Sequence, residues 1–169
     1  YFADGMTDEI INALTQLADL RVVARTSTFS FKGKHEDLRS IGEKLQVRHV
    51  VEGSVRKAGN RLRITVQLVS VDDGFHVWSE RYDREMDDVF AIQDDIATTI
   101  AAKLQVTLTS AGIDRLIKPA TENLHAYDEY LRGMALMHRR GIAILEAIES
   151  FGRAIALDAN YAVAYNNRG

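Results

Sequence analysis

The sequence predicts a two-layer α+β domain followed by an all-helical segment. Between residues 47 and 82, three strand-like stretches are separated by two short turns, which is the pattern of an antiparallel meander. Helical periodicity flanks the meander on both sides, and strand patterning disappears from residue 124 onward. We therefore expect a mixed sheet that contains this meander, with its helices packed on one face.

The first third of the chain contributes two expected helices and one expected strand. A helix over about residues 7–18 has Thr7 as its N-cap and places Ile10 and Leu14 on one apolar face. Residues 20–25 are short, β-branched and bounded by polar residues, so they are expected to form a strand that makes the sheet mixed. A second helix is expected after Asp37.

The meander itself carries the strongest strand signal. Residues 47–57 have strand composition and end at the turn formed by Gly59 and Asn60. Apolar and polar residues then alternate over 61–68, as on a strand with one buried face. After a second turn at 72–74, a third strand is expected over 75–82, and the next helix has an apolar stripe at Val89, Ile92, Ile96, Ile100 and Leu104.

Composition excludes several classes of function. The 169 residues are 46% hydrophobic and 27% charged, with a formal charge of −3 and no cysteine. Disulfides and thiol chemistry are therefore absent, and no apolar run reaches the roughly 20 residues of a membrane-spanning helix. The chain begins with Tyr1 and ends inside an expected helix, so we expect a fragment of a longer protein.

The helical segment follows an expected linker at 109–123, which contains Gly112 and the only proline. Residues 124–169 resemble a tetratricopeptide (TPR) array of one repeat plus the truncated first helix of the next. The packing residues that carry this resemblance are Gly133, Ala147, Phe151, Ala154, Tyr165 and Gly169. Ala159 replaces the usual proline, and Gly133 lies about two residues too far upstream, so a plain helical hairpin is the alternative.

The front domain, residues 1–108, resembles the TolB amino-terminal-like domain. The motifs that carry the resemblance are FADGMTDEI at 2–10, VVARTS at 22–27, FSFKG at 29–33, VEGSVR at 51–56 and WSERYDR at 78–84. In that family the domain commonly stands between an amino-terminal output module and a TPR array. The output module is often a class III adenylate or guanylate cyclase, and sometimes a winged-helix DNA-binding domain.

The resemblance implies a non-catalytic regulatory and protein-interaction region of a bacterial multidomain signalling protein, attached to such a cyclase and involved in cyclic nucleotide biosynthesis. The expected location is the cytoplasm, or the periplasmic side of the inner membrane if the longer protein carries a membrane span. The sensor region of a winged-helix transcription regulator is one alternative. A small-ligand-binding or enzymatic α/β domain is another. The expected partner is a protein bound through the TPR segment, with a homodimer as a further possibility and no nucleic acid bound by this fragment.

No motif in the sequence indicates catalysis, a cofactor or a metal. The five histidines are scattered singly, without metal-ligand spacing. Paired acids at 72–73, 87–88 and 94–95 are placed in a turn, at a helix start and on the wet face of a helix. Gly53 and Gly59 flank a strand and lack the pattern of a phosphate-binding loop.

The candidate binding residues fall in two places. The loop at 25–34 combines cations, hydroxyls and aromatic rings, which suit an anionic ligand or a partner protein: Arg25, Thr26, Ser27, Phe29, Phe31 and Lys32. The alternative is that its phenylalanines fill the edge of the core while Thr26 and Ser27 cap the turn. Trp78 and Tyr82 share one face of the third strand and are expected to contact another part of the chain or a dimer mate. Basic residues at the first hairpin tip are expected to form a solvated edge.

Overall fold

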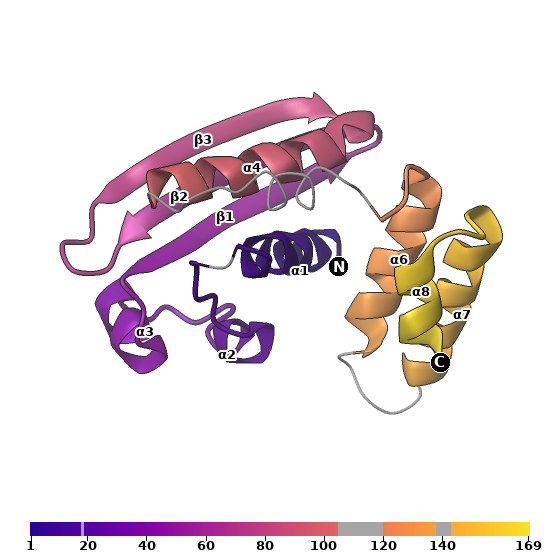
Figure 1. Cartoon of the computed structure of the whole chain (residues 1–169), viewed down its shortest axis with the longest axis horizontal. Coiled ribbons are helices and arrows are strands. Elements are labelled where there is room, and N and C mark those ends of the chain that lie inside the picture. Colours follow the sequence, from indigo (N-terminus) through magenta and orange to yellow (C-terminus); the bar gives the residue numbers. More distant parts are fainter. Residues whose placement is uncertain (18, 105–119, 138–142) are drawn as a thin grey trace. The chain divides into compact units, whose positions relative to one another are not determined.

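The computed structural model describes residues 1–17, 19–104, 120–137 and 143–169, which divide into two compact units (Figure 1). One unit is Asp8–Ile117, and the other joins Tyr1–Thr7 to Lys118–Gly169. Helix α1 (Phe2–Thr15) contributes residues to both units. The first is called the α/β unit and the second the helical unit.

The α/β unit is built on a three-stranded antiparallel sheet. Its strands are β1 (His49–Ala58), β2 (Arg61–Ser70) and β3 (His76–Glu85), in the order β1-β2-β3. The turns between them contain Gly59 and Gly74, whose φ angles of 58° and 75° lie in the left-handed region that favours glycine. The meander expected from the sequence is therefore confirmed, with β3 continuing three residues beyond its expected end.

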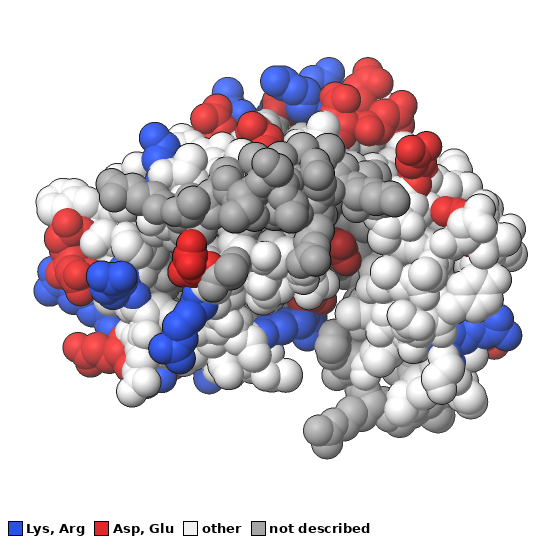
Figure 2. All heavy atoms as spheres, viewed as in Figure 1, with Lys and Arg blue, Asp and Glu red and all other residues white. Residues whose placement is uncertain are grey.

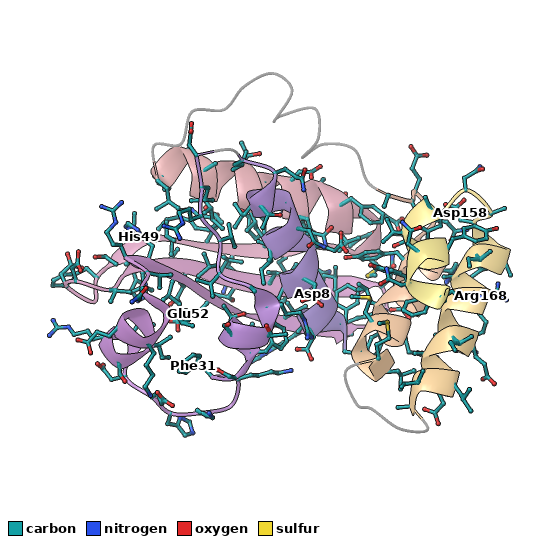
Figure 3. The ribbon with its side chains drawn as sticks, turned by 60° about the horizontal axis from the view of Figure 1, so that its bottom comes forward. Asp8, Phe31, His49, Glu52, Asp158 and Arg168 are labelled. Atoms are coloured by element: carbon teal, nitrogen blue, oxygen red, sulfur yellow. The ribbon has the colours of Figure 1, made fainter. Side chains whose placement is uncertain are left out.

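Helices cover one face of this sheet, as expected. Helix α4 (Val89–Lys103) follows the 3₁₀ turn η1 (Met86–Asp88) and packs along β2 and β3, and Figures 1 and 3 show α1 on the same side. Helix α3 (Leu38–Leu45) starts directly after Asp37. The core consists of alternate residues of β2 and the stripe of α4: Leu62, Ile64, Val66, Leu68, Ile92, Ile96 and Ile100. The α+β class is thus confirmed.

Helix α1 begins five residues earlier than the sequence analysis predicted. The expected N-cap, Thr7, lies inside the helix, and its hydroxyl donates a hydrogen bond to the carbonyl oxygen of Ala3 at 2.9 Å. Phe2 and Met6 are buried, so the apolar stripe extends toward the N-terminus. Tertiary packing of these two side chains therefore overrides the capping signal.

The strand expected at 20–25 is wrong. Residues 20–24 are irregular, and Arg25 opens the short helix α2 (Arg25–Phe29). Val22 and Val23 are half-buried without any strand partner, so their β-branched composition reports burial and not pairing. The described sheet is consequently all antiparallel instead of mixed.

The helical unit is a hairpin of two long helices followed by a short one. These are α6 (Leu124–Met137), α7 (Ala143–Leu157) and α8 (Ala162–Arg168). Most of the expected linker at 109–123 lies outside the described residues. Asn123 caps α6, since its side-chain oxygen accepts hydrogen bonds from the backbone N–H groups of His125 and Ala126 at 3.0 and 3.1 Å.

Close approach of α6 and α7 depends on Gly133. A Cβ atom at this position would lie 2.6 Å from the ring of Phe151, which is fully buried. Gly152, on α7, has nothing within 4 Å of the same hypothetical atom. A side chain at position 133 would therefore clash with Phe151, whereas one at position 152 would meet open space.

We expect Gly133→Ala to destabilise the chain by about 1–3 kcal/mol, because the Phe151 ring has no space into which to move. The control, Gly152→Ala, should leave stability unchanged or raise it by up to about 1 kcal/mol, since alanine is the better helix former. Urea unfolding followed by circular dichroism measures both. Equal effects of the two substitutions would contradict the packing argument.

Candidate functional site

The candidate loop at 25–34 is organised by Arg25. Its guanidinium forms an ion pair with the carboxylate of Asp8 on α1 and lies 3.8 Å from the ring centroid of Phe29. The side chains of Asp8 and Arg25 are only 8% and 20% exposed. The cation thus joins α1 to α2 through a largely desolvated contact.

The lysines of this region are also placed against aromatic rings. Lys32 lies 5.7 Å from the Phe29 centroid, and Lys34 and Lys44 lie 5.8 and 5.7 Å from that of Phe31. Figure 3 shows Phe31 beside α3, the helix that carries Lys44. Of the six loop residues predicted to bind a ligand or partner, the structure therefore brings Arg25, Phe29 and Lys32 together, while Phe31 contacts Lys34 and Lys44 instead.

The two remaining loop residues, Thr26 and Ser27, are exposed. The hydroxyls that bond to the backbone of this turn come from neighbouring positions. Thr28 donates to the carbonyl oxygen of Arg25 at 2.9 Å, and Ser30 donates to that of Ser27 at 2.7 Å. Hydroxyl groups therefore do bond to the backbone of this turn, but they belong to Thr28 and Ser30 and not to Thr26 and Ser27 as the alternative expected.

Glu9 is a site residue that the sequence analysis missed. Burial, followed by the neighbouring charge of Asp8, raises the pKa of Glu9 to about 7. Within the described part of the chain, no hydrogen bond or ion pair reaches its carboxyl group. A protonation site near neutral pH therefore lies one residue away from the buried ion pair.

Trp78 and Tyr82 lie on the helix-packed side of β3, where they face Leu68 and Ile64 of β2. Tyr82 is buried, and its hydroxyl donates a hydrogen bond to the carboxylate of Asp95 on α4 at 2.5 Å. Burial and this bond raise the pKa of Tyr82 above its ordinary value. Tyr82 therefore fastens α4 to the sheet and is separate in role from the 25–34 loop.

The predicted packing residues of the helical unit have different environments. Ala147, Phe151 and Ala154 are fully buried, and Gly133 faces Phe151. Tyr165 is 47% exposed, and Gly169 follows α8 as its C-cap. The buried aromatic residue at this end is Tyr161, which lies 5.1 Å from the ring of Tyr130 and was not identified from the sequence.

The two ends of the α6–α7 hairpin are joined by polar groups. The Thr121 hydroxyl donates to the carboxylate of Asp158 at 2.5 Å, and the Asn123 side-chain amide donates to the carbonyl oxygen of Leu157 at 2.9 Å. The bond from Thr121 lowers the pKa of Asp158. We call these four residues the hairpin clasp. Arg153 of α7 also pairs with Glu129 of α6 at 2.9 Å.

Comparison with known proteins places the α/β unit in a family. The family model described as "HilA/YgeH-like transcriptional regulator, second domain" matches residues 2–99, which is more than half of the chain. The chain belongs to this family. Its fold and the Arg25 site both lie within the matched residues.

A relative with the same family region extends the match into the helical unit. The chain is 40% identical over 166 residues to a Rhizobium meliloti (strain 1021) protein named "Putative adenylate cyclase 3". That alignment covers 98% of this chain and 28% of the relative. The chain therefore spans less than a third of the length of this bacterial homologue.

The described residues of this HilA/YgeH-like chain contain neither a cluster of metal ligands nor a membrane-spanning helix. No group of three or more histidine or acidic side chains there is arranged to hold a metal ion. No described helix has both the length and the apolar character needed to cross a bilayer.

We expect Asp8→Asn and Arg25→Met each to destabilise the HilA/YgeH-like domain by about 3 kcal/mol, because either change leaves the partner charge buried without compensation. The double variant should lose much less than the sum of the two, since it leaves no unpaired charge. A double-mutant cycle in urea unfolding measures this coupling. Additive losses would contradict a direct ion pair.

Glu9→Gln should stabilise the chain at neutral and higher pH. Because folding raises the pKa of Glu9 from 4.5 to about 7, its protonated form favours the folded state, and this stability is lost as pH rises through about 7. The variant should therefore gain up to about 3 kcal/mol relative to the parent near pH 8 and little near pH 4. Urea unfolding at both pH values tests this, and Glu43→Gln controls for removing one negative charge at an exposed position.

Proposed function

We propose that this chain is a regulatory and protein-interaction region, without catalytic activity of its own, of a bacterial multidomain signalling protein whose output module is a class III adenylate or guanylate cyclase. The observation that carries the proposal is the 40% identity to the Rhizobium protein, which runs through both structural units. The other 72% of that protein's length leaves room for an output module. The resemblance of residues 1–108 to the TolB amino-terminal-like domain supports the same architecture.

The chemistry of the α/β unit supports a non-catalytic role. Two of the groups that were predicted to bind a ligand or partner are engaged in internal contacts: Arg25 with Asp8 and Phe29, and Tyr82 with Asp95. A reactive site in the 25–34 loop would need a free nucleophile and base, and the described contacts of that loop supply neither. An enzymatic or small-ligand role for this unit is therefore the less favoured alternative.

We further propose that the helical unit is the start of a TPR array that binds a protein partner. Small and aromatic residues meet where α6 and α7 pack, as the TPR resemblance implies. The outer side of this unit exposes large apolar side chains: Ile144, Leu145, Ile148, Leu157 and Tyr165. In Figure 2 the visible face of these helices is mostly uncharged. Such a surface suits either further repeats or a protein partner.

A second candidate is a sensor region of a winged-helix transcription regulator. The family description, which names transcriptional regulators, favours it. The cyclase assignment has the broader support, because the relative that carries it matches 98% of this chain, whereas the family model ends at residue 99. In both candidates, this region changes the populations of the conformational states of an attached output module.

The test is a cyclase assay on the full-length natural protein beside the isolated chain. We expect the full-length protein to convert ATP or GTP to its cyclic monophosphate, the isolated chain to be inactive, and Gly133→Ala in the full-length protein to change activity while Gly152→Ala does not. Cyclic nucleotide formation by the isolated chain would refute the non-catalytic role. Promoter binding without cyclase activity would establish the second candidate instead.

A further inference from the structure

The sheet has a second face that the packing against α4 does not use. Residues of β2 that alternate with its buried ones point away from α4, and their cross-strand neighbours share this side. All are exposed or half-buried. We call this surface the open face of the sheet and define it as Glu52, Ser54, Arg56, Ala58, Arg61, Arg63, Thr65, Gln67, Ser79, Arg81, Asp83 and Glu85.

Arginine is concentrated on this face. Arg56 on β1 lies directly opposite Arg63 on β2. Arg81 on β3 lies opposite Thr65, which follows Arg63 by two residues on the same face of β2. One carboxylate serves two of the arginines, because Asp83 accepts hydrogen bonds from Arg61 at 3.1 Å and from Arg63 at 2.6 Å. These bonds, from Arg63 first, lower the pKa of Asp83.

Arg56 and Arg81 differ from Arg61 and Arg63 in their contacts with carboxylates. In the part of the chain that the structure describes, no carboxylate contacts either guanidinium. Like charges directly opposite each other in a sheet are destabilising, so the Arg56 and Arg63 pair works against folding. A surface in a chain of net charge −3 thus carries two cations that no described carboxylate contacts, while Glu52 and Glu85 lie at its two ends.

The two cations have a defined spacing. They stand on the outer strands with β2 between them, and they are two residues apart along the ladder. With about 4.8 Å between neighbouring strands and about 3.4 Å per residue, their backbones are roughly 12 Å apart. Ser54, two residues from Arg56, pairs across the strands with Thr65, which lies opposite Arg81, and both offer hydroxyl groups. Two arginines at this backbone spacing match two carboxylates of one ligand, each held by a charge-assisted hydrogen bond.

We propose that the open face of the sheet docks an acidic segment of a partner protein, in which two carboxylates about 12 Å apart pair with Arg56 and Arg81. Hydroxyl and amide groups of Ser54, Thr65 and Gln67 hydrogen-bond to the backbone of the segment between those carboxylates. The surface belongs to the α/β unit alone, so this proposal and the assignment of partner binding to the helical unit stand or fall separately.

A protein segment fits this face better than a nucleic acid. Single-stranded nucleic acids bind sheets through aromatic rings that stack on bases, and the open face carries none. Trp78 and Tyr82 of β3 belong to the opposite, helix-packed side.

The experiment measures fluorescence anisotropy of a labelled oligoglutamate peptide with the full chain, at low and at physiological salt. We expect saturable binding that weakens with salt, absent for oligoglutamine, and reduced at least about tenfold by Arg56→Gln with Arg81→Gln. A control variant, Arg21→Gln with Lys103→Gln, removes two exposed cations elsewhere and should change affinity less than about threefold. Melting temperature separates binding from folding: Arg56→Gln should leave it unchanged or raise it.

Four results would overturn the proposal. They are no binding of oligoglutamate, an equal loss in the control variant, tighter binding of an oligothymidylate than of oligoglutamate, and a change in solution mass with the Arg56 and Arg81 variant. The third result would make the face a nucleic-acid surface. The last, measured by light scattering, would make it a contact between two copies of this chain. None of these results bears on the cyclase assay, so failure here is distinguishable from failure of the proposed function.

Discussion

The alternation of β2 is the constraint on which the α/β unit depends. Its even-numbered residues from Leu62 to Leu68 form the core against α4, while Arg61, Arg63, Thr65 and Gln67 face the other way. A slip of one residue in register would put arginines in the core, so the register is strongly specified. The left-handed turns at Gly59 and Gly74 hold it at both ends. Packing on one face and a charged surface on the other are thus two results of a single pattern.

Much of this fold could be predicted from the sequence because its signals are local. Turn glycines and strict alternation define the meander, and the stripe from Val89 to Ile100 defines α4. The failures occurred where a distant contact decides. Nothing near Val22 and Val23 indicates that Arg25 pairs with Asp8. Where a strand was expected to end, this ion pair is found at the first residue of helix α2. The start of α1 was misplaced because burial of Phe2 is a tertiary property.

The candidate site was predictable in composition but not in arrangement. Cations and aromatic rings of the 25–34 loop do come together, yet they contact one another and α1, which no spacing rule reveals. The Glu9 site could not be predicted, because its desolvation depends on the side chains that pack around it. Likewise, Tyr161 and Tyr165 both suit a helix start by type, and only the packing against Tyr130 shows that the first is the buried one.

The hairpin clasp has a mechanical consequence. Thr121 and Asn123 precede α6, while Leu157 and Asp158 end α7, so the chain enters and leaves this hairpin at one point. Tension applied between the chain segments on either side of the hairpin would load these few hydrogen bonds directly. The interface lined by Gly133 and Phe151 lies farther along both helices and would bear that load only after the clasp had opened. Under such tension, the hydrogen bonds of the hairpin clasp therefore break first, and the packing of Gly133 against Phe151 is disrupted only afterwards.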